Sequence, residues 1–127
     1  MFRCVLIGLT LSAATLVAQA QAVVARQFPA TALRGEMVFG QPPEVLLNGK
    51  PARMVPASRI RGTNNLLVLS GSLIGTKAMV HYTLDTQGFV KDVWILRDDE
   101  LIKPWPRTAE EASRWQFEPI SQTWTPR

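Results

Sequence analysis

The stretch from Lys77 to Leu96 constrains the fold more than any other part of the chain, because its pattern favours two strands joined by a tight turn. In its first half, apolar side chains recur at a period of two, which is typical of a strand with one buried face. The apolar set is Val80, Tyr82 and Leu84. Residues 85–88, Asp-Thr-Gln-Gly, predict a turn in which Gly88 adopts a positive φ. The fold must therefore contain an antiparallel ribbon.

The returning strand of this ribbon has an irregular apolar spacing. Val90 and Val93 are three residues apart, whereas Ile95 follows Val93 after two. A strict period of two cannot point all three side chains inward, but one extra residue restores the alternation. We therefore predict a β-bulge near Lys91-Asp92.

A second hairpin is predicted over residues 44–53. Asn48-Gly49 supplies the two left-handed residues of a type I′ turn, which matches the twist of paired strands. Pro51 has no N–H group, so its strand should lie at an edge or pair on one side only. Further along, the continuous apolar run Leu-Leu-Val-Leu at residues 66–69 predicts a strand buried on both faces.

The C-terminal region predicts one short helix. Thr108 and Glu111 have the spacing of a capping box, so the helix should run from Ala109 to about Arg114 or Trp115. Phe117 follows shortly after and, with Trp115, is expected to anchor the helix in the core. Before the helix, the acidic residues 98–100 are expected to form a solvated loop.

Together these elements predict an α+β fold, in which a small, mostly antiparallel sheet is packed by one short C-terminal helix. The domain should cover residues 44–127, after an irregular lead-in over residues 23–43 that glycines and prolines interrupt. The predicted structural core consists of Val80, Tyr82, Leu84, Val90, Val93, Ile95, Trp115 and Phe117.

The N-terminus has the features of a secretory signal peptide. Arg3 is followed by an apolar run to Val17, and then by small residues that alternate with glutamine over residues 18–22. The alternative, a membrane anchor, needs about 20 apolar residues, more than this run provides. We predict a signal peptide at residues 1–22, cleaved after Ala20 or Ala22, and a periplasmic or secreted protein. Cys4 is the only cysteine and leaves with the leader, so the mature chain has no thiol for a disulfide, a metal site or a nucleophile.

The sequence contains no recognisable catalytic, cofactor or metal motif. Its single histidine, His81, has no carboxylate at ligand spacing and no linear nucleophile or orienting partner, so we expect a histidine on a strand surface. Residues 98–100 lack the alternation and the glycine of a calcium loop. We therefore expect a protein that is not an enzyme, and a hydrolase ranks third among the functions considered.

Positive charge is concentrated in the first half of the mature chain. Residues 23–81 carry seven Lys or Arg against two Glu, a net charge of +5. This surface could meet an anionic envelope polymer or an acidic partner. Nucleic acid is not expected, because the basic segment lacks interleaved aromatic residues. The candidate ligand or partner contacts are Lys50, Arg53, Arg59, Arg61 and Trp94, of which Trp94 either faces solvent or packs under the proline-rich segment near residue 105.

Two segments resemble the C-terminal domains of TonB proteins. The first is Tyr82 to Leu96, with the turn Asp85-Thr86-Gln87-Gly88 and then Val90-Lys91-Asp92-Val93-Trp94-Ile95-Leu96, which is similar to the central hairpin of that family. The second is Ala112-Ser113-Arg114-Trp115-Gln116-Phe117-Glu118-Pro119, which is similar to the end of the family's helix. With their flanking residues they span 78–120.

The resemblance implies a non-enzymatic periplasmic interaction module that binds peptide segments of an envelope protein, partly by strand addition. The family's helix before the first strand and its last strand have no counterpart here, so we expect residues 44–70 to replace the missing strand. An alternative function is binding of an anionic envelope polymer or a small ligand through the basic hairpin region. In either case we expect no cofactor and, after cleavage, no membrane-spanning segment.

Overall fold

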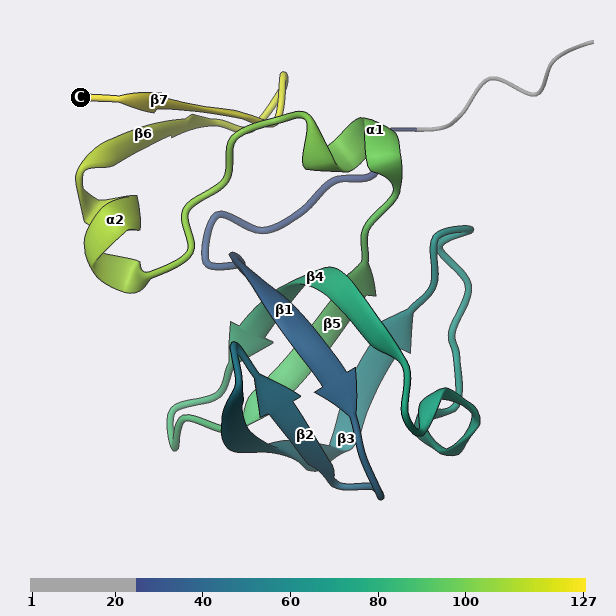
Figure 1. Ribbon diagram of the computed structural model, residues 1–127. Coiled ribbons are helices and arrows are strands. Elements are labelled where there is room, and N and C mark those ends of the chain that lie inside the picture. Colours follow the sequence, from purple (N-terminus) through teal and green to yellow (C-terminus); the bar gives the residue numbers. More distant parts are fainter. Residues whose placement is uncertain (1–24) are drawn as a thin grey trace, which may run out of the picture.

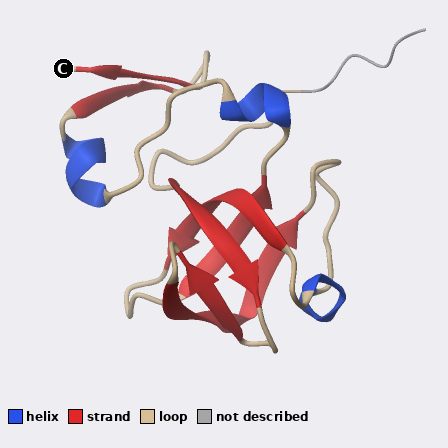
Figure 2. Ribbon diagram, in the orientation of Figure 1, coloured by secondary structure: helices blue, strands red, loops and turns tan. Residues whose placement is uncertain are grey.

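The computed structural model describes residues 25–127, so the predicted signal peptide lies outside the described residues. The fold is mixed and consists mostly of strands, as the sequence predicts (Figure 1 and Figure 2). The first five strands are β1 (Leu33–Phe39), β2 (Glu44–Leu47), β3 (Lys50–Arg61), β4 (Lys77–Leu84) and β5 (Val90–Ile95). The other elements are the 3-10 helix η1 (Ser70–Leu73), helices α1 (Asp98–Leu101) and α2 (Ala109–Ser113), and strands β6 (Trp115–Glu118) and β7 (Thr123–Pro126).

Strands β1 to β5 form a closed barrel in the order β1-β2-β3-β5-β4, in which β4 pairs back onto β1. Only β3 and β5 are parallel, and the other barrel pairs are antiparallel. This is the connectivity of the OB-fold, a five-stranded Greek-key barrel. The expected small, mostly antiparallel sheet is thus present but closes on itself, and β6 and β7 form a second, two-stranded sheet.

The prediction of an irregular lead-in over residues 23–43 is wrong, because β1 is a full barrel strand. It pairs with both β2 and β4, and it contributes Met37 and Phe39 to the core. The sequence does not predict this strand, because Gly35 interrupts the alternation of apolar residues along it. A Cβ atom at Gly35 would lie 3.0 Å from the Tyr82 ring, so glycine is what allows β1 to approach β4 this closely.

The two predicted hairpins are confirmed. Asn48 and Gly49 both adopt positive φ, 53° and 80°, as a type I′ turn requires. Pro51 pairs with β2 only, since the ladder between β3 and β5 begins at Met54. In the second hairpin the register shifts so that Lys91 has no opposite residue, which places the bulge where the apolar spacing predicts it.

The barrel interior forms the first hydrophobic cluster, with Phe39, Met37, Val80, Val90 and Val93 fully buried. The core prediction is confirmed for four residues, which are buried: Val80, Tyr82, Val90 and Val93. A fifth predicted residue, Ile95, is half-buried and packs against this cluster. For Leu84 the prediction is wrong, because this side chain is 46% exposed. Leu84 has the right parity, but it is the last residue of β4, where the barrel ends.

A second hydrophobic cluster covers the outside of the barrel. It is formed by Phe28, Ala32, Leu96, Trp105 and Trp124. Trp115 and Phe117 pack against this cluster and are half-buried, whereas the sequence placed them in the core of the ribbon. Trp115 also lies in β6, after α2 has ended. The capping of α2 is as expected at its first residue, since the Thr108 hydroxyl accepts the Glu111 N–H at 3.1 Å.

Residues 25–32, here called the N-terminal strap, hold the two layers together. In Figure 1 the strap runs between the barrel and the layer of α1, β6 and β7. Phe28 contacts the rings of His81, Trp94 and Trp105, at centroid distances of 4.6, 5.7 and 5.7 Å. The strap is therefore the common partner of both layers.

Two further local predictions are wrong. Residues 98–100 form part of α1 and not a loop, and Glu100 is buried against Arg26, whereas Asp98 and Asp99 are exposed as expected. Residues 66–69 are not a buried strand, because they contribute only an isolated bridge between Leu67 and Arg61. Leu66, Leu67 and Leu69 are exposed. The barrel is already closed by its five strands, so no ladder position remains for this segment.

Candidate functional site

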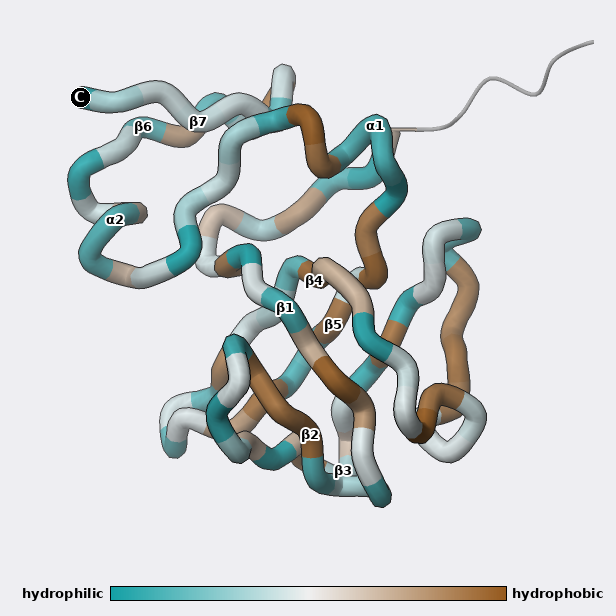
Figure 3. Tube along the Cα trace, in the orientation of Figure 1, coloured by the Kyte–Doolittle hydropathy of each residue, from teal (hydrophilic) through white to brown (hydrophobic). Residues whose placement is uncertain are grey.

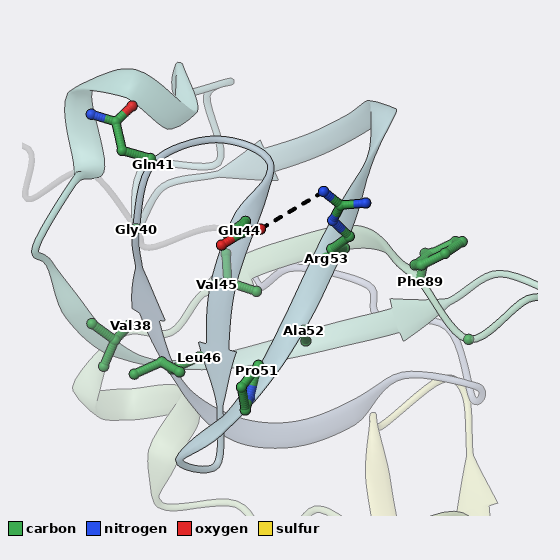
Figure 4. Close-up of a pocket in the computed structure, with 11 residues that line it drawn as sticks. Val38, Gly40, Gln41, Glu44, Val45, Leu46, Pro51, Ala52, Arg53 and Phe89 are labelled. Carbon is green, nitrogen blue, oxygen red and sulfur yellow. Dashed lines mark ion pairs between the residues drawn. The ribbon is translucent and has the colours of Figure 1, made fainter.

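A groove with a volume of about 680 Å³ lies on the outer face of β1, β2 and β3 (Figure 4). The β1–β2 loop and the β4–β5 turn bound it. Its lining residues are Val38, Gly40, Gln41, Glu44, Val45, Leu46, Pro51, Ala52, Arg53, Gly88 and Phe89. Two loops and three strands thus converge on one concave surface, the usual setting of a binding site.

The floor of the groove is an apolar row that crosses three strands. Val38 lies opposite Leu46, and Leu46 lies opposite Pro51. Because Met37 and Val45 point into the barrel, these neighbours point outward. Leu46 is 41% exposed. A row of apolar side chains on the solvent side of a closed barrel contributes nothing to the core.

The rim of the groove combines one ion pair and one aromatic ring. Arg53 and Glu44 lie opposite each other on β3 and β2, with 3.7 Å between guanidinium and carboxylate, and both side chains are exposed. Phe89 stands at the other side of Arg53 in Figure 4. Its position is set by the β4–β5 turn, where the Asp85 carboxylate accepts the N–H groups of Gln87 and Phe89 at 2.9 and 2.8 Å. The groove therefore offers apolar contact, a salt-bridge partner and a ring.

The groove has the chemistry of a binding surface. Its lining contains no histidine, serine or second carboxylate beside Glu44 that could serve as a nucleophile, a base or a paired acid. Elsewhere in residues 25–127, no three His, Cys, Asp or Glu side chains come together as a metal site. The arrangement can hold an extended ligand by side-chain contacts alone.

The structure brings only one of the predicted basic contacts into the groove. Because Met54 and Ile60 point into the barrel, Arg53, Arg59 and Arg61 point outward from the same strand, and Arg53 alone lines the groove. Lys50 is exposed beside the Asn48-Gly49 turn, at the opposite end of the hairpin. Arg61 donates to the Asn65 carbonyl at 3.2 Å.

Trp94, the remaining predicted contact, lies away from the groove. It is half-buried and packs edge-on against Phe28 of the strap. Of the two expectations for Trp94, full exposure to solvent is wrong, because the ring packs against the second hydrophobic cluster, where its ring contact is Phe28. The groove residue Leu46 is not predicted, because residues 45–47 are all apolar and the sequence does not say which side of the strand is inside. No pattern in the sequence singles out Pro51 or Phe89 as a ligand contact.

His81 is buried, so the prediction of an exposed histidine on a strand surface is wrong. The side chain is on the outer face of β4, as its parity predicts, but Phe28 and Trp105 cover it at centroid distances of 4.6 and 4.3 Å. Nδ1 has no hydrogen-bond partner within the described residues. Burial, followed by the positive charges of Arg34 and Arg26, lowers the pKa of His81 to about 3. The ring is therefore neutral at physiological pH.

A buried ion pair lies beside His81. Arg26 of the strap donates to both carboxylate oxygens of Glu100, and also to the carbonyls of Gly62 and Ile95 at 2.9 and 2.8 Å. Glu100 in turn accepts the backbone N–H of Arg97 at 2.9 Å. These bonds tie the strap to the end of β5 and to α1. The adjoining cavity has a volume of only about 60 Å³, so this region is structural support and not a ligand pocket.

Comparison with family models, with curated proteins and with solved structures finds no match for this chain. In residues 25–127, the helices are too short and too polar for any of them to cross a bilayer. Its function must therefore be inferred from the site itself.

Proposed function

We propose that the protein is an exported, non-enzymatic binding module, and that its groove holds an extended segment of a partner protein in the cell envelope. The observation that carries this proposal is the outward apolar row of Val38, Leu46 and Pro51, with Phe89 at its side. Exposed apolar patches rimmed by polar groups mark interaction surfaces. Neighbouring strands are about 4.8 Å apart, so the row matches about three residues of an extended chain.

The position of the groove on the barrel supports the same proposal. OB-folds bind oligonucleotides and oligosaccharides on the face of strands 2 and 3, between the loops that join strands 1 to 2 and 4 to 5. The groove occupies the corresponding elements. This support is an analogy at the level of the fold, and the ligand class rests on the side chains.

The resemblance to TonB C-terminal domains also favours a partner segment as ligand. The two segments of this resemblance lie in different sheets, since residues 82–96 include the β4–β5 turn of the barrel and residues 112–119 include all of β6. Among the described strands, the barrel leaves no unpaired edge, whereas β6 and β7 each have one. Strand addition is therefore proposed for the two-stranded sheet, and side-chain recognition for the groove.

A second candidate is a binder of an anionic envelope polymer. It is favoured by Arg53, Arg59 and Arg61, which all point outward from β3. Binding of this kind collapses as ionic strength rises, whereas apolar contacts in the groove persist. Alanine at Arg59 and Arg61 should abolish retention on a polyanion column and leave groove binding unchanged.

Selection of peptides from a displayed library on the purified protein tests the leading proposal. The selected peptides should carry apolar residues at alternate positions. Combining Leu46→Ala with Phe89→Ala should weaken their binding by about tenfold or more, as loss of two partly buried apolar contacts implies. Leu84→Ala is the matched control, because Leu84 is as exposed as Leu46 and lies outside the groove. Equal binding by the groove variant and the control would rule out the groove.

A further inference from the structure

The connection between β3 and β4, residues 62–76, is an apolar loop on the surface of the barrel. It contains no charged residue. Figure 3 shows hydrophobic colour along this connection, where it stands out from the side of the barrel. Its four exposed aliphatic side chains are between 50% and 82% accessible; they are Leu66, Leu67, Leu69 and Ile74. They make up nearly half of the large apolar residues exposed in residues 25–127.

The backbone of this loop is held in place. The Val68 N–H donates to the Ile60 carbonyl at 2.8 Å, and the Gly75 N–H donates to the Phe39 carbonyl at 2.6 Å. Val68 and Leu73 are half-buried against the barrel core. The loop thus has an inner side that packs on the barrel, and the exposed aliphatic side chains are held away from it.

Basic residues stand at both ends of the loop. Arg59 and Arg61 precede it on the outer face of β3, and Lys77 follows it at the start of β4. Within residues 25–127 Arg59 forms no ion pair, although Asp92 lies opposite it in the ladder. Lys77 and Glu36 form an exposed pair at 3.4 Å. The surface around the loop therefore combines protruding aliphatic groups with adjacent positive charge.

We propose that residues 62–76 dock on an anionic lipid bilayer, with the exposed aliphatic side chains in the headgroup and acyl boundary and with Arg59 and Arg61 on the headgroups. Charge complementarity favours this occupant, because the loop contains no acidic residue and the three basic residues at its ends outnumber the two neighbouring carboxylates, Glu36 and Asp92. A protein interface is favoured less, since the loop has none of the aromatic residues in which protein interfaces are enriched.

Docking through one loop is reversible. Each basic residue near an anionic surface strengthens binding about fivefold, and each partly inserted leucine strengthens it about tenfold. Neither the basic residues alone nor the leucines alone give stable attachment. A single covalently attached acyl chain likewise gives only marginal, reversible membrane binding. The loop therefore concentrates the protein at a membrane, while the groove on the neighbouring strands remains open to a partner. This inference stands independently of the groove proposal.

Vesicle flotation tests the proposal, using protein purified from the exported fraction in the form that the cell processes. Vesicles of phosphatidylethanolamine with phosphatidylglycerol should carry the protein upward, and vesicles of phosphatidylcholine should carry much less. Leu66→Ser combined with Leu69→Ser should reduce binding about a hundredfold. Arg59→Gln should reduce binding to the anionic vesicles about fivefold. All variants share one N-terminus, so differences between them report on the loop.

The matched control replaces Ile102 and Ile120 by serine, because these residues are 83% and 90% exposed and lie outside the loop. It should float like the wild type. The proposal is overturned if the loop variant binds vesicles as well as the control does, or if wild-type protein ignores anionic vesicles. Loop-dependent dimerisation, or loop-dependent capture of a protein without vesicle binding, would also overturn it in favour of another occupant. Unchanged peptide binding by the loop variant would show that the groove is intact.

Discussion

Protonation of His81 should control the acid stability of the protein. The folded state holds this ring neutral, with a pKa near 3, whereas in the unfolded chain it titrates near 6.5. Between these values the unfolded state binds more protons than the folded state, so stability falls as pH falls. The contribution of His81 is complete above about pH 6.5 and disappears progressively toward pH 3.

The magnitude follows from linkage. Lowering the pH from 7 to 5 removes about 2 kcal/mol of unfolding free energy through His81 alone, and reaching pH 3 removes about 4 kcal/mol. Replacing the ring by phenylalanine abolishes this titration and retains the contacts with Phe28 and Trp105. It also removes the unpartnered Nδ1 atom. The larger ring can expand into the adjoining cavity of about 60 Å³.

Urea denaturation followed by tryptophan fluorescence measures the effect at pH 7 and pH 5. The wild type should lose about 2 kcal/mol more between these values than His81→Phe does. The comparison cancels the effect of the charged groups around the ring, Arg26, Arg34 and Glu100, because both proteins carry them. Identical pH dependence in the two proteins would refute the argument that burial keeps His81 neutral.

Two further predictions concern the packing of the strap and the barrel. Glu100→Gln leaves the buried Arg26 guanidinium without its counter-charge. It should lower the free energy of unfolding, measured by chemical denaturation, by about 3–5 kcal/mol. Asp99→Asn is the control, because Asp99 is on the exposed side of α1 and its replacement should leave the free energy of unfolding nearly unchanged. An undiminished midpoint for Glu100→Gln would contradict the role assigned to the ion pair. Gly35→Ala should lower thermal stability by about 1–3 kcal/mol, because its Cβ would lie 3.0 Å from Tyr82, while Gly71→Ala meets no atom within 4 Å and is the control. Equal melting temperatures for these two variants would refute the close approach of β1 and β4.

Local features of the fold could be predicted from the sequence. The Asn48-Gly49 turn, the bulge near Lys91 and the start of α2 all depend on residues within a few positions of one another. The chemistry of turns and caps is carried by such neighbours. These elements therefore appear in the structure nearly where the pattern places them.

Closure of the barrel and the covering of its outer face could not be predicted in this way. Phe28 meets His81, and Arg26 meets Glu100, across more than fifty residues of chain. Periodicity identifies the two faces of a strand, but it does not say whether the second face meets solvent or another layer. This is why His81 was placed on the surface, and why Leu46 was not recognised as part of a groove.

The contacts of the strap also determine when, during synthesis of the chain, folding can be completed. Arg26 and Phe28 are among the first residues of the described chain to be synthesised, yet their partners extend as far as Gln122, 94 positions later. The strap can therefore complete its contacts only after almost the whole chain has been made. Contacts of such long sequence separation form late and slowly. A fusion partner that restrains residues 25–32, or a truncation that removes them, would thus leave the outer face of the barrel around His81 without its cover.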